Sequence, residues 1–172
     1  GQISIKIELN KQDKKSIYIN GIAIKKVGEL LGNIHSVFFN PAELKLVQDS
    51  PEDRRRFMNV SLSQMSKTYF YALLRYNKIL SQRNNLLKDP DKFLIRETLP
   101  IWDEQLVKEA GKIIKARNDF LAEISPIAQD KHSSLSGGKE TLIMTTESGY
   151  SGGEEQISLA LKEDLRLALD KD

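Results

Sequence analysis

The amino-acid sequence predicts an α+β fold in which a small antiparallel sheet is followed by a long antiparallel pair of helices. Residues 2–9 alternate apolar and polar side chains, as a half-buried strand does. Asn20 and Gly21 separate two short apolar runs, and both residues tolerate the positive φ angles of a two-residue hairpin turn. Residues 69–87 and 99–127 carry apolar side chains at heptad-like spacing, which is typical of paired helices.

The β-rich part is expected to occupy the first 40 residues. After the hairpin, residues 27–31 are expected to form a short helix that ends at Gly32. Residues 34–39 are almost continuously apolar, which predicts a strand that is buried on both faces.

A junction connects this sheet to the helices. An Asn-Pro dipeptide ends the strand, and residues 42–47 are expected to form a short helical step. Ser50 is a good N-cap, and Pro51 suits the first helical position because its missing N–H needs no partner there. We therefore expect a helix that begins at Pro51 and ends near Gln64.

The two long helices are expected to form an antiparallel hairpin. The first covers residues 69–87, and an Asp-Pro dipeptide stops it. Residues 91–99 are expected to form a connector, and the second helix begins at Leu99 or Pro100. The apolar stripes of both helices, which include Trp102, favour core packing over a ligand site.

The remaining residues are expected to return to the sheet. Residues 129–139 are predicted to be a loop, residues 140–146 a strand, and residues 155–169 an amphipathic helix. These elements give three parts: a β-rich part over residues 1–40, a helical lobe over residues 41–130, and a returning loop, strand and helix over residues 131–172.

The charge is distributed unevenly along the 172 residues, although the formal net charge is only +2. Residues 1–88 hold 15 Lys and Arg against 7 Asp and Glu, whereas residues 89–172 hold 11 against 17. The basic half is a candidate face for a polyanion, but ordinary solvated helix surfaces explain the charge equally well. The chain has no cysteine, which excludes disulfides and is compatible with the cytoplasmic location that we expect. No apolar run is long enough for a membrane helix, so no membrane partner is expected.

No constellation of residues predicts catalysis or metal binding. The SGGK run at 136–139 lacks both the first glycine of a phosphate-binding loop and the Ser or Thr after the lysine. The SGGE run at 151–154 superficially resembles a nucleotide-contacting loop of ABC-type ATPases, but a flexible turn before a helix is favoured. His35 and His132 have no second ligand at metal spacing. We therefore expect no catalytic residue, no metal, no cofactor and no enzymatic activity in this chain.

Binding of a polyanion has more support. Three consecutive arginines, Arg54 to Arg56, spread over roughly 200° of a helix, so they do not all face one partner. Ion pairs with Glu43, Glu52 or Asp53 are expected to hold some of them, which leaves one for a partner. The composition supports contacts to phosphates that do not depend on sequence. The candidate DNA- or partner-binding residues are Arg54, Arg55, Arg56, Lys67, Arg75, Lys78, Arg83 and Lys88.

Several spaced motifs resemble the bacterial RecF family. Residues 38–58, FFNPAELKLVQDSPEDRRRFM, are similar to the family pattern F-x-P-E-D-L-x-L-V-x-G-S-P-x-x-R-R-R-F-L-D. The runs LSQRNNLLK at 80–88 and IWDEQL at 101–106 continue the pattern in order. Departures occur where Ala-Glu replaces Glu-Asp, where Asp49 replaces glycine, and where Met-Asn replaces Leu-Asp. They weaken any assignment of chemistry to those side chains.

The resemblance implies a DNA repair and recombination protein similar to the SMC-like ATPase heads. It implies that ATP with Mg²⁺ drives homodimerisation, that DNA is bound near junctions of single and double strands, and that RecR and RecO help to place RecA on gapped DNA. In that family the Walker A loop precedes the stretch that matches this chain, and the signature loop and Walker B follow it. The chain is therefore expected to be a central lobe-II fragment that acts as a DNA and dimer-interface scaffold. The alternative is a purely structural protein-interaction module with no DNA role.

Overall fold

The computed structural model describes residues 2–9, 15–37, 46, 50–146 and 148–169. The chain forms two compact units, residues 1–71 and residues 72–172. The boundary between these units falls inside a continuous helix.

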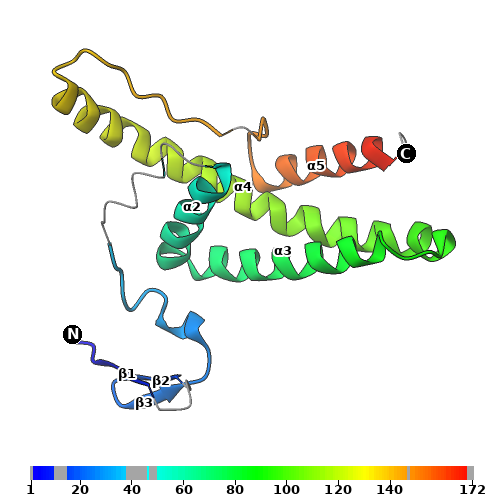
Figure 1. Cartoon of the computed structure of the whole chain (residues 1–172), viewed down its shortest axis with the longest axis horizontal. Coiled ribbons are helices and arrows are strands. Elements are labelled where there is room, and N and C mark those ends of the chain that lie inside the picture. Colours follow the sequence, from blue (N-terminus) through cyan, green and yellow to red (C-terminus); the bar gives the residue numbers. More distant parts are fainter. Residues whose placement is uncertain (1, 10–14, 38–45, 47–49, 147, 170–172) are drawn as a thin grey trace. The chain divides into compact units, whose positions relative to one another are not determined.

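The first unit begins with a three-stranded antiparallel sheet (Figure 1). Its strands are β1 (Ile5–Leu9), β2 (Lys15–Ile19) and β3 (Ile22–Ile24), in the order β1-β2-β3. Asn20 has a φ of 51° and Gly21 a φ of 82°, the left-handed values that the turn between β2 and β3 requires. The predicted first strand and the predicted hairpin are both confirmed.

One face of this sheet consists of isoleucines from all three strands. The register places them in two rows, Ile5–Ile19–Ile22 and Ile7–Ile17–Ile24. Ile17, in the central strand, is 6% exposed, whereas Ile7 and Ile22 on the edge strands are 50% and 73% exposed. Only the middle of this apolar face is therefore covered by the described residues.

The segment after the sheet differs in part from the expectation. A 3-10 helix, η1 (Val27–Leu30), forms where a short helix is predicted. The predicted strand is wrong over residues 34–37, where Ile34 makes one isolated bridge and the Val37 side chain is fully exposed. An apolar run becomes a strand only when a neighbouring strand pairs with it, and no described strand does so. The rest of that prediction, and nearly all of the predicted step at 42–47, lie outside the described residues.

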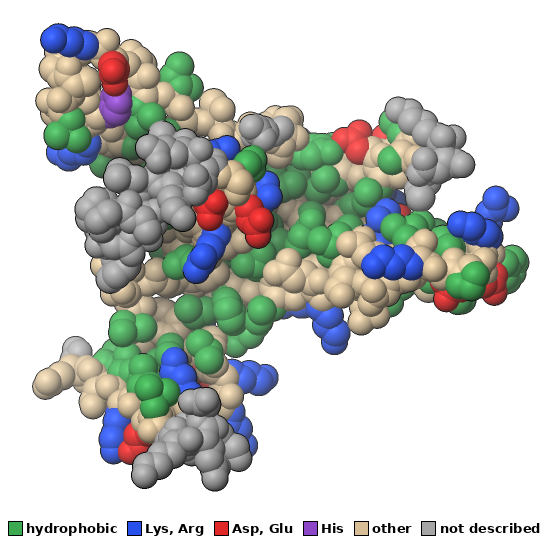
Figure 2. Space-filling view, in the orientation of Figure 1, with side chains coloured by type: hydrophobic (Ala, Val, Ile, Leu, Met, Phe, Trp, Pro, Cys, Tyr) green, Lys and Arg blue, Asp and Glu red, His purple; other side chains and the backbone are tan. Residues whose placement is uncertain are grey.

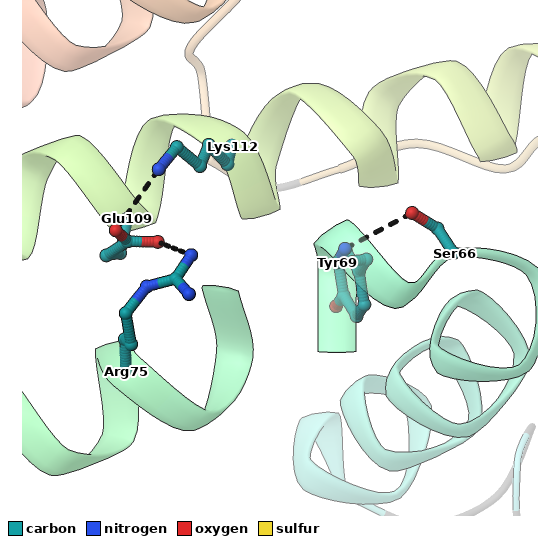
Figure 3. A network of polar contacts seen from close by, with 5 residues as sticks. All are labelled: Ser66, Tyr69, Arg75, Glu109 and Lys112. Atoms are coloured by element: carbon teal, nitrogen blue, oxygen red, sulfur yellow. Dashed lines mark hydrogen bonds and ion pairs between the residues drawn. The ribbon is translucent and has the colours of Figure 1, made fainter. Parts of the chain in front are cut away.

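Two helices complete the first unit and lead into the second. Helix α2 (Pro51–Met65) begins after Ser50 with proline at its start, as predicted, and α3 (Lys67–Leu86) follows after one residue. Ser66 Oγ accepts a hydrogen bond of 3.2 Å from the Tyr69 backbone N–H (Figure 3). The Tyr69 hydroxyl donates to Asn59 Oδ1 of α2 over 2.6 Å. These bonds fix the tight turn between the two helices.

The second unit is organised on α4 (Lys92–Ser136), a helix of 45 residues. The expectation that it starts at Leu99 or Pro100 is wrong, and the predicted loop at 129–139 is wrong over residues 129–136, which belong to the helix. Asp91 caps the helix by accepting hydrogen bonds from the N–H groups of Phe93 and Leu94. The helix then runs through Pro100 because Leu99 and Leu106, buried on either side of it, hold both parts against the core. It ends at Gly137, which has a left-handed φ of 62°.

Helices α3 and α4 form the predicted antiparallel hairpin (Figure 1). Arg75 contacts Glu109, and eight residues farther along α3, Arg83 contacts Asp103, six residues earlier in α4. Contacts that run in opposite directions along two helices define an antiparallel pair. The buried apolar side chains of this unit are Ala72, Ile79, Leu99, Leu106, Val107, Ala110, Ile113, Phe120 and Ile157.

Helix α5 (Glu154–Leu169) lies antiparallel to α4 (Figure 1). Ile157 is fully buried, and Ser158 Oγ donates to the Val107 carbonyl of α4 over 3.2 Å. Residues 140–146, predicted to be a strand, are not part of a sheet, and Ile143 is 79% exposed. This segment is held instead by Asn118 of α4, which accepts a hydrogen bond from Thr146. No helix in the described part of the chain combines the length and apolar character that crossing a membrane requires.

We expect Gly111→Ala to destabilise the protein. An added Cβ would lie 2.2 Å from Ser158 Oγ and 2.9 Å from the Glu154 carbonyl oxygen, and forced repacking costs about 1–3 kcal/mol. Helix propensity alone predicts that Gly111→Ala stabilises the protein, because alanine favours a helix over glycine by about 1 kcal/mol. Urea unfolding measures the difference, and Gly111→Ala with Ser158→Gly should recover part of it. A variant at least as stable as the parent would contradict the close approach of α4 and α5.

Candidate nucleic-acid interface

The arginine triad lies at the start of α2 in the first unit. Arg54, Arg55 and Arg56 are all exposed, and their consecutive positions direct them to different sides of the helix. Asp53, one of the carboxylates expected to pair with them, accepts a hydrogen bond of 3.0 Å from the Ser50 hydroxyl. The triad therefore presents cationic groups around the first turns of α2.

Arg75 belongs to a polar network between α3 and α4 (Figure 3). Its Nη2 lies 2.9 Å from Glu109 Oε2, and Lys112 Nζ lies 3.1 Å from the other oxygen of that carboxylate. Burial raises the pKa of Glu109, but the hydrogen bonds and charges of Arg75 and Lys112 outweigh it, so the pKa lies below its ordinary value. The Arg75 side chain remains half-exposed.

Arg83 is the most deeply placed of the predicted cations. Its Nε lies 2.5 Å from Asp103 Oδ1, and the two side chains are 13% and 11% exposed. The expected helix start at Leu99 or Pro100 would place Asp103 in the first turn, where its charge would favour the helix dipole, and this placement is wrong. The helix begins eleven residues earlier, so Asp103 lies inside it and neutralises Arg83.

The other predicted cations remain on the surface. Lys67 is the first residue of α3 and belongs to the first unit. Its side chain passes near Gly32, because a Cβ atom added to that glycine would lie 3.8 Å from Lys67 Cε. Lys78 and Lys88 are exposed in the second unit, and neither has an ion-pair partner in the described part of the chain. The structure thus brings Arg75 and Arg83 to carboxylates of α4 and leaves Lys78 and Lys88 open to solvent.

Sequence reasoning missed the two carboxylates that oppose the α3 arginines. Glu109 and Asp103 are 7% and 8% exposed, which is rare for acidic residues unless they are paired. A signal was available, because each lies among the apolar positions of a predicted helix that faces another helix carrying arginines. Which arginine meets which carboxylate depends on the register of the pair, and the spacing of apolar residues leaves several registers open.

No other described group forms a chemical site. Among the described residues no three His, Asp or Glu side chains are placed to hold a metal ion. His132 Nε2 lies 3.5 Å from a Glu140 oxygen, an isolated contact. The Gly153 N–H donates to Gln156 Oε1 over 2.9 Å, so the glycine pair before α5 forms the start of that helix, as expected.

The sequence relatives and the solved structures that match this chain belong to one family. No protein-family model matches the chain. It is 42% identical over 168 residues to the DNA replication and repair protein RecF of Lachnospira eligens, and 40% identical over 169 residues to that of Agathobacter rectalis. These alignments cover 94% and 95% of this chain and 46% of each relative.

Solved structures agree with the sequence relatives. A structure of the recombination mediator protein RecF-ATPrS in the RecFOR pathway superposes with a TM-score of 0.85 at 31% identity, over 98% of this chain and 46% of that one. A RecF-ATP structure from the same pathway gives a TM-score of 0.80 at 30% identity, over 96% and 46%.

The sheet and helical hairpin define an α+β protein, and this arrangement is the one found in the RecF structures. The chain is a RecF-family sequence, so the resemblance indicated by its motifs is confirmed. It spans about half the length of the curated relatives that it matches.

We expect Arg83→Met to lower the free energy of unfolding by about 3–5 kcal/mol, because it leaves the Asp103 carboxylate buried without a partner. The double variant Arg83→Met with Asp103→Leu should recover most of that loss. Lys78→Met, at an exposed position of the same helix, should change stability by no more than about 0.5 kcal/mol. Urea unfolding of all three variants is the measurement. A double variant no more stable than the single one would contradict the pairing.

We expect Glu109 to make stability sensitive to acid. Its pKa is lower in the folded state, so the stability it contributes is present above its unfolded pKa of about 4.3 and is lost as the pH falls through the folded value. Urea unfolding of Glu109→Gln and the parent over a pH series should give curves that converge on acidification. Glu104→Gln, at an exposed position of α4, is the control. A difference that stays constant with pH would disprove this role.

Proposed function

We propose that this chain is part of a RecF-like, ATP-dependent DNA-binding repair protein that helps to load RecA at single-strand gaps. The observation that carries the proposal is the agreement of sequence and backbone with RecF over nearly the whole chain. The proposed partners of the complete protein are DNA at junctions of single and double strands, RecR and RecO. The RecFOR pathway in the descriptions of both solved structures supports this assignment.

Within such a protein, this chain serves as a scaffold for DNA and for the dimer interface. We assign ATP, Mg²⁺ and the Walker motifs to the rest of the protein, and no catalysis to this part. The isoleucine face of the sheet supports the existence of such a remaining part. Ile7 and Ile22 are exposed, and packing of further protein on them would remove their unfavourable contact with water. An ATP-dependent homodimer and a cytoplasmic location complete the proposal.

A purely structural interaction module is the second candidate. It is favoured by one observation: Arg75 and Arg83, two of the eight cations predicted to bind DNA, pair with carboxylates of the same unit. In that case the hairpin would stabilise contacts between proteins and would have no role at DNA.

Salt dependence distinguishes the two functions. We expect the chain to bind a fluorescent duplex that carries a single-stranded overhang, with an affinity that falls linearly in a plot of log K against log salt, because binding cations release counterions from the phosphates. Fluorescence anisotropy over a salt series measures this slope.

An ATP titration by calorimetry accompanies that measurement, and no stoichiometric heat is expected. Absence of DNA binding at low salt would remove the DNA role and leave the structural module. Stoichiometric, Mg²⁺-dependent binding of ATP would overturn the assignment of the nucleotide site to the rest of the protein.

A further inference from the structure

The outward side of the second half of α3 carries no carboxylate. From Ala72 to Leu86 the helix contains no Asp or Glu, and the turn that follows it adds a lysine before the first acidic residue. Ala72, Ile79 and Arg83 form the inward side against α4. At about 100° per residue, the exposed residues opposite them fall in one sector of the helix. We call this the outer face of α3. It consists of Lys78, Ser81, Gln82 and Asn85 around Leu74, with Arg75 at the edge nearest α4 and Lys88 directly beyond the helix.

The two buried carboxylates of α4 are turned away from this outer face. Glu109 and Asp103 point at α3 from its inward side, where Arg75 and Arg83 neutralise them. Glu104 follows Asp103, so it leaves α4 about 100° away from the side that faces α3. Figure 2 shows blue side chains among tan and green ones along the visible side of α3, and both red and blue ones at the turn end of the hairpin. An approaching anion therefore meets cations and neutral donors on the outer face.

The chemistry of the outer face fits a phosphate backbone better than a protein segment. Lysine, arginine, serine, asparagine and glutamine are the side chains that contact phosphate and sugar oxygens in nucleic-acid complexes. Protein interfaces depend on clusters of buried aromatic or aliphatic anchors, and this face holds one exposed apolar residue, Leu74. Lys78 and Lys88 are ten residues apart, roughly 15 Å if helical, and this length spans about four phosphates of one strand.

We propose that the outer face of α3 binds the sugar–phosphate backbone of nucleic acid without reading its sequence. Lys78 and Lys88 supply the charge, and Ser81, Gln82 and Asn85 supply neutral hydrogen-bond donors. Arg75, whose side chain stays half-exposed beside Glu109, contacts the backbone from the edge of the face. Arg83 has no part in the binding because it is buried. The proposal rests on the DNA-binding function proposed above, and it assigns that function to one surface.

Two matched pairs of variants test the assignment by fluorescence anisotropy on the same duplex with an overhang. Lys78→Gln with Lys88→Gln should lower the slope of log K against log salt by about 2 and weaken binding at least about 10-fold near physiological salt. Lys92→Gln with Lys108→Gln removes two exposed lysines from α4 and should leave K within about 2-fold of the parent. Gln82→Glu places a carboxylate on the outer face and should weaken binding, whereas Gln105→Glu on α4 should not.

The outcomes separate this inference from the function on which it rests. If the parent chain does not bind the duplex at any salt, the DNA-binding function and the outer face both fail. If the parent binds with a steep salt slope and the α3 variants behave like their α4 controls, only the outer face is overturned. Circular dichroism spectra that match the parent show that each variant is folded, so a loss of binding reports on the surface.

Discussion

The ion pairs that the buried carboxylates Asp103 and Glu109 of α4 form with arginines of α3 are the constraint on which the second unit depends. Apolar residues at heptad-like spacing allow two helices to slide by a turn at modest cost, because one leucine replaces another. Arg83 opposite Asp103 and Arg75 opposite Glu109 remove that freedom. A shift by one turn would leave charges buried without partners, which is far more costly than a poorly packed methyl group. We infer that these pairs fix the register of the hairpin.

The register in turn determines where α5 docks. Once α4 is fixed against α3, the side of α4 that carries Gly111 is left for another helix, and the absent side chain allows a close approach there. Ser158 of α5 occupies that position and donates a hydrogen bond to the Val107 carbonyl. Asn118, two turns farther along α4, donates a hydrogen bond of 2.9 Å to the carbonyl of Tyr150, just ahead of α5. The chain thus returns along α4 through polar contacts, which explains why residues 140–146 need no sheet.

Much of the fold could be predicted because its signals are local. Asn20 and Gly21 determine their turn by themselves, and Ser50 with Pro51 determines the start of α2. The failures share a physical cause, which is dependence on a distant partner. Residues 34–37 look like a buried strand, but strand formation requires a neighbour that a local pattern cannot reveal. Pro100 indicates a helix start by local rules, yet packing of the flanking leucines carries α4 through it.

The same reasoning changes the meaning of the charge distribution. A basic first half and an acidic second half suggest a polarised surface when they are counted along the sequence. The hairpin folds part of the basic half onto part of the acidic half, so Arg75 and Arg83 neutralise Glu109 and Asp103, the two buried carboxylates. What remains for a partner is the charge that this pairing leaves unused, and in the second unit it includes Lys78 of α3 and Lys88 directly beyond that helix. The ion pairs that fix the hairpin therefore also turn Glu109 and Asp103 of α4 towards α3. The outer face of α3 is left without these carboxylates because of how the two helices pack.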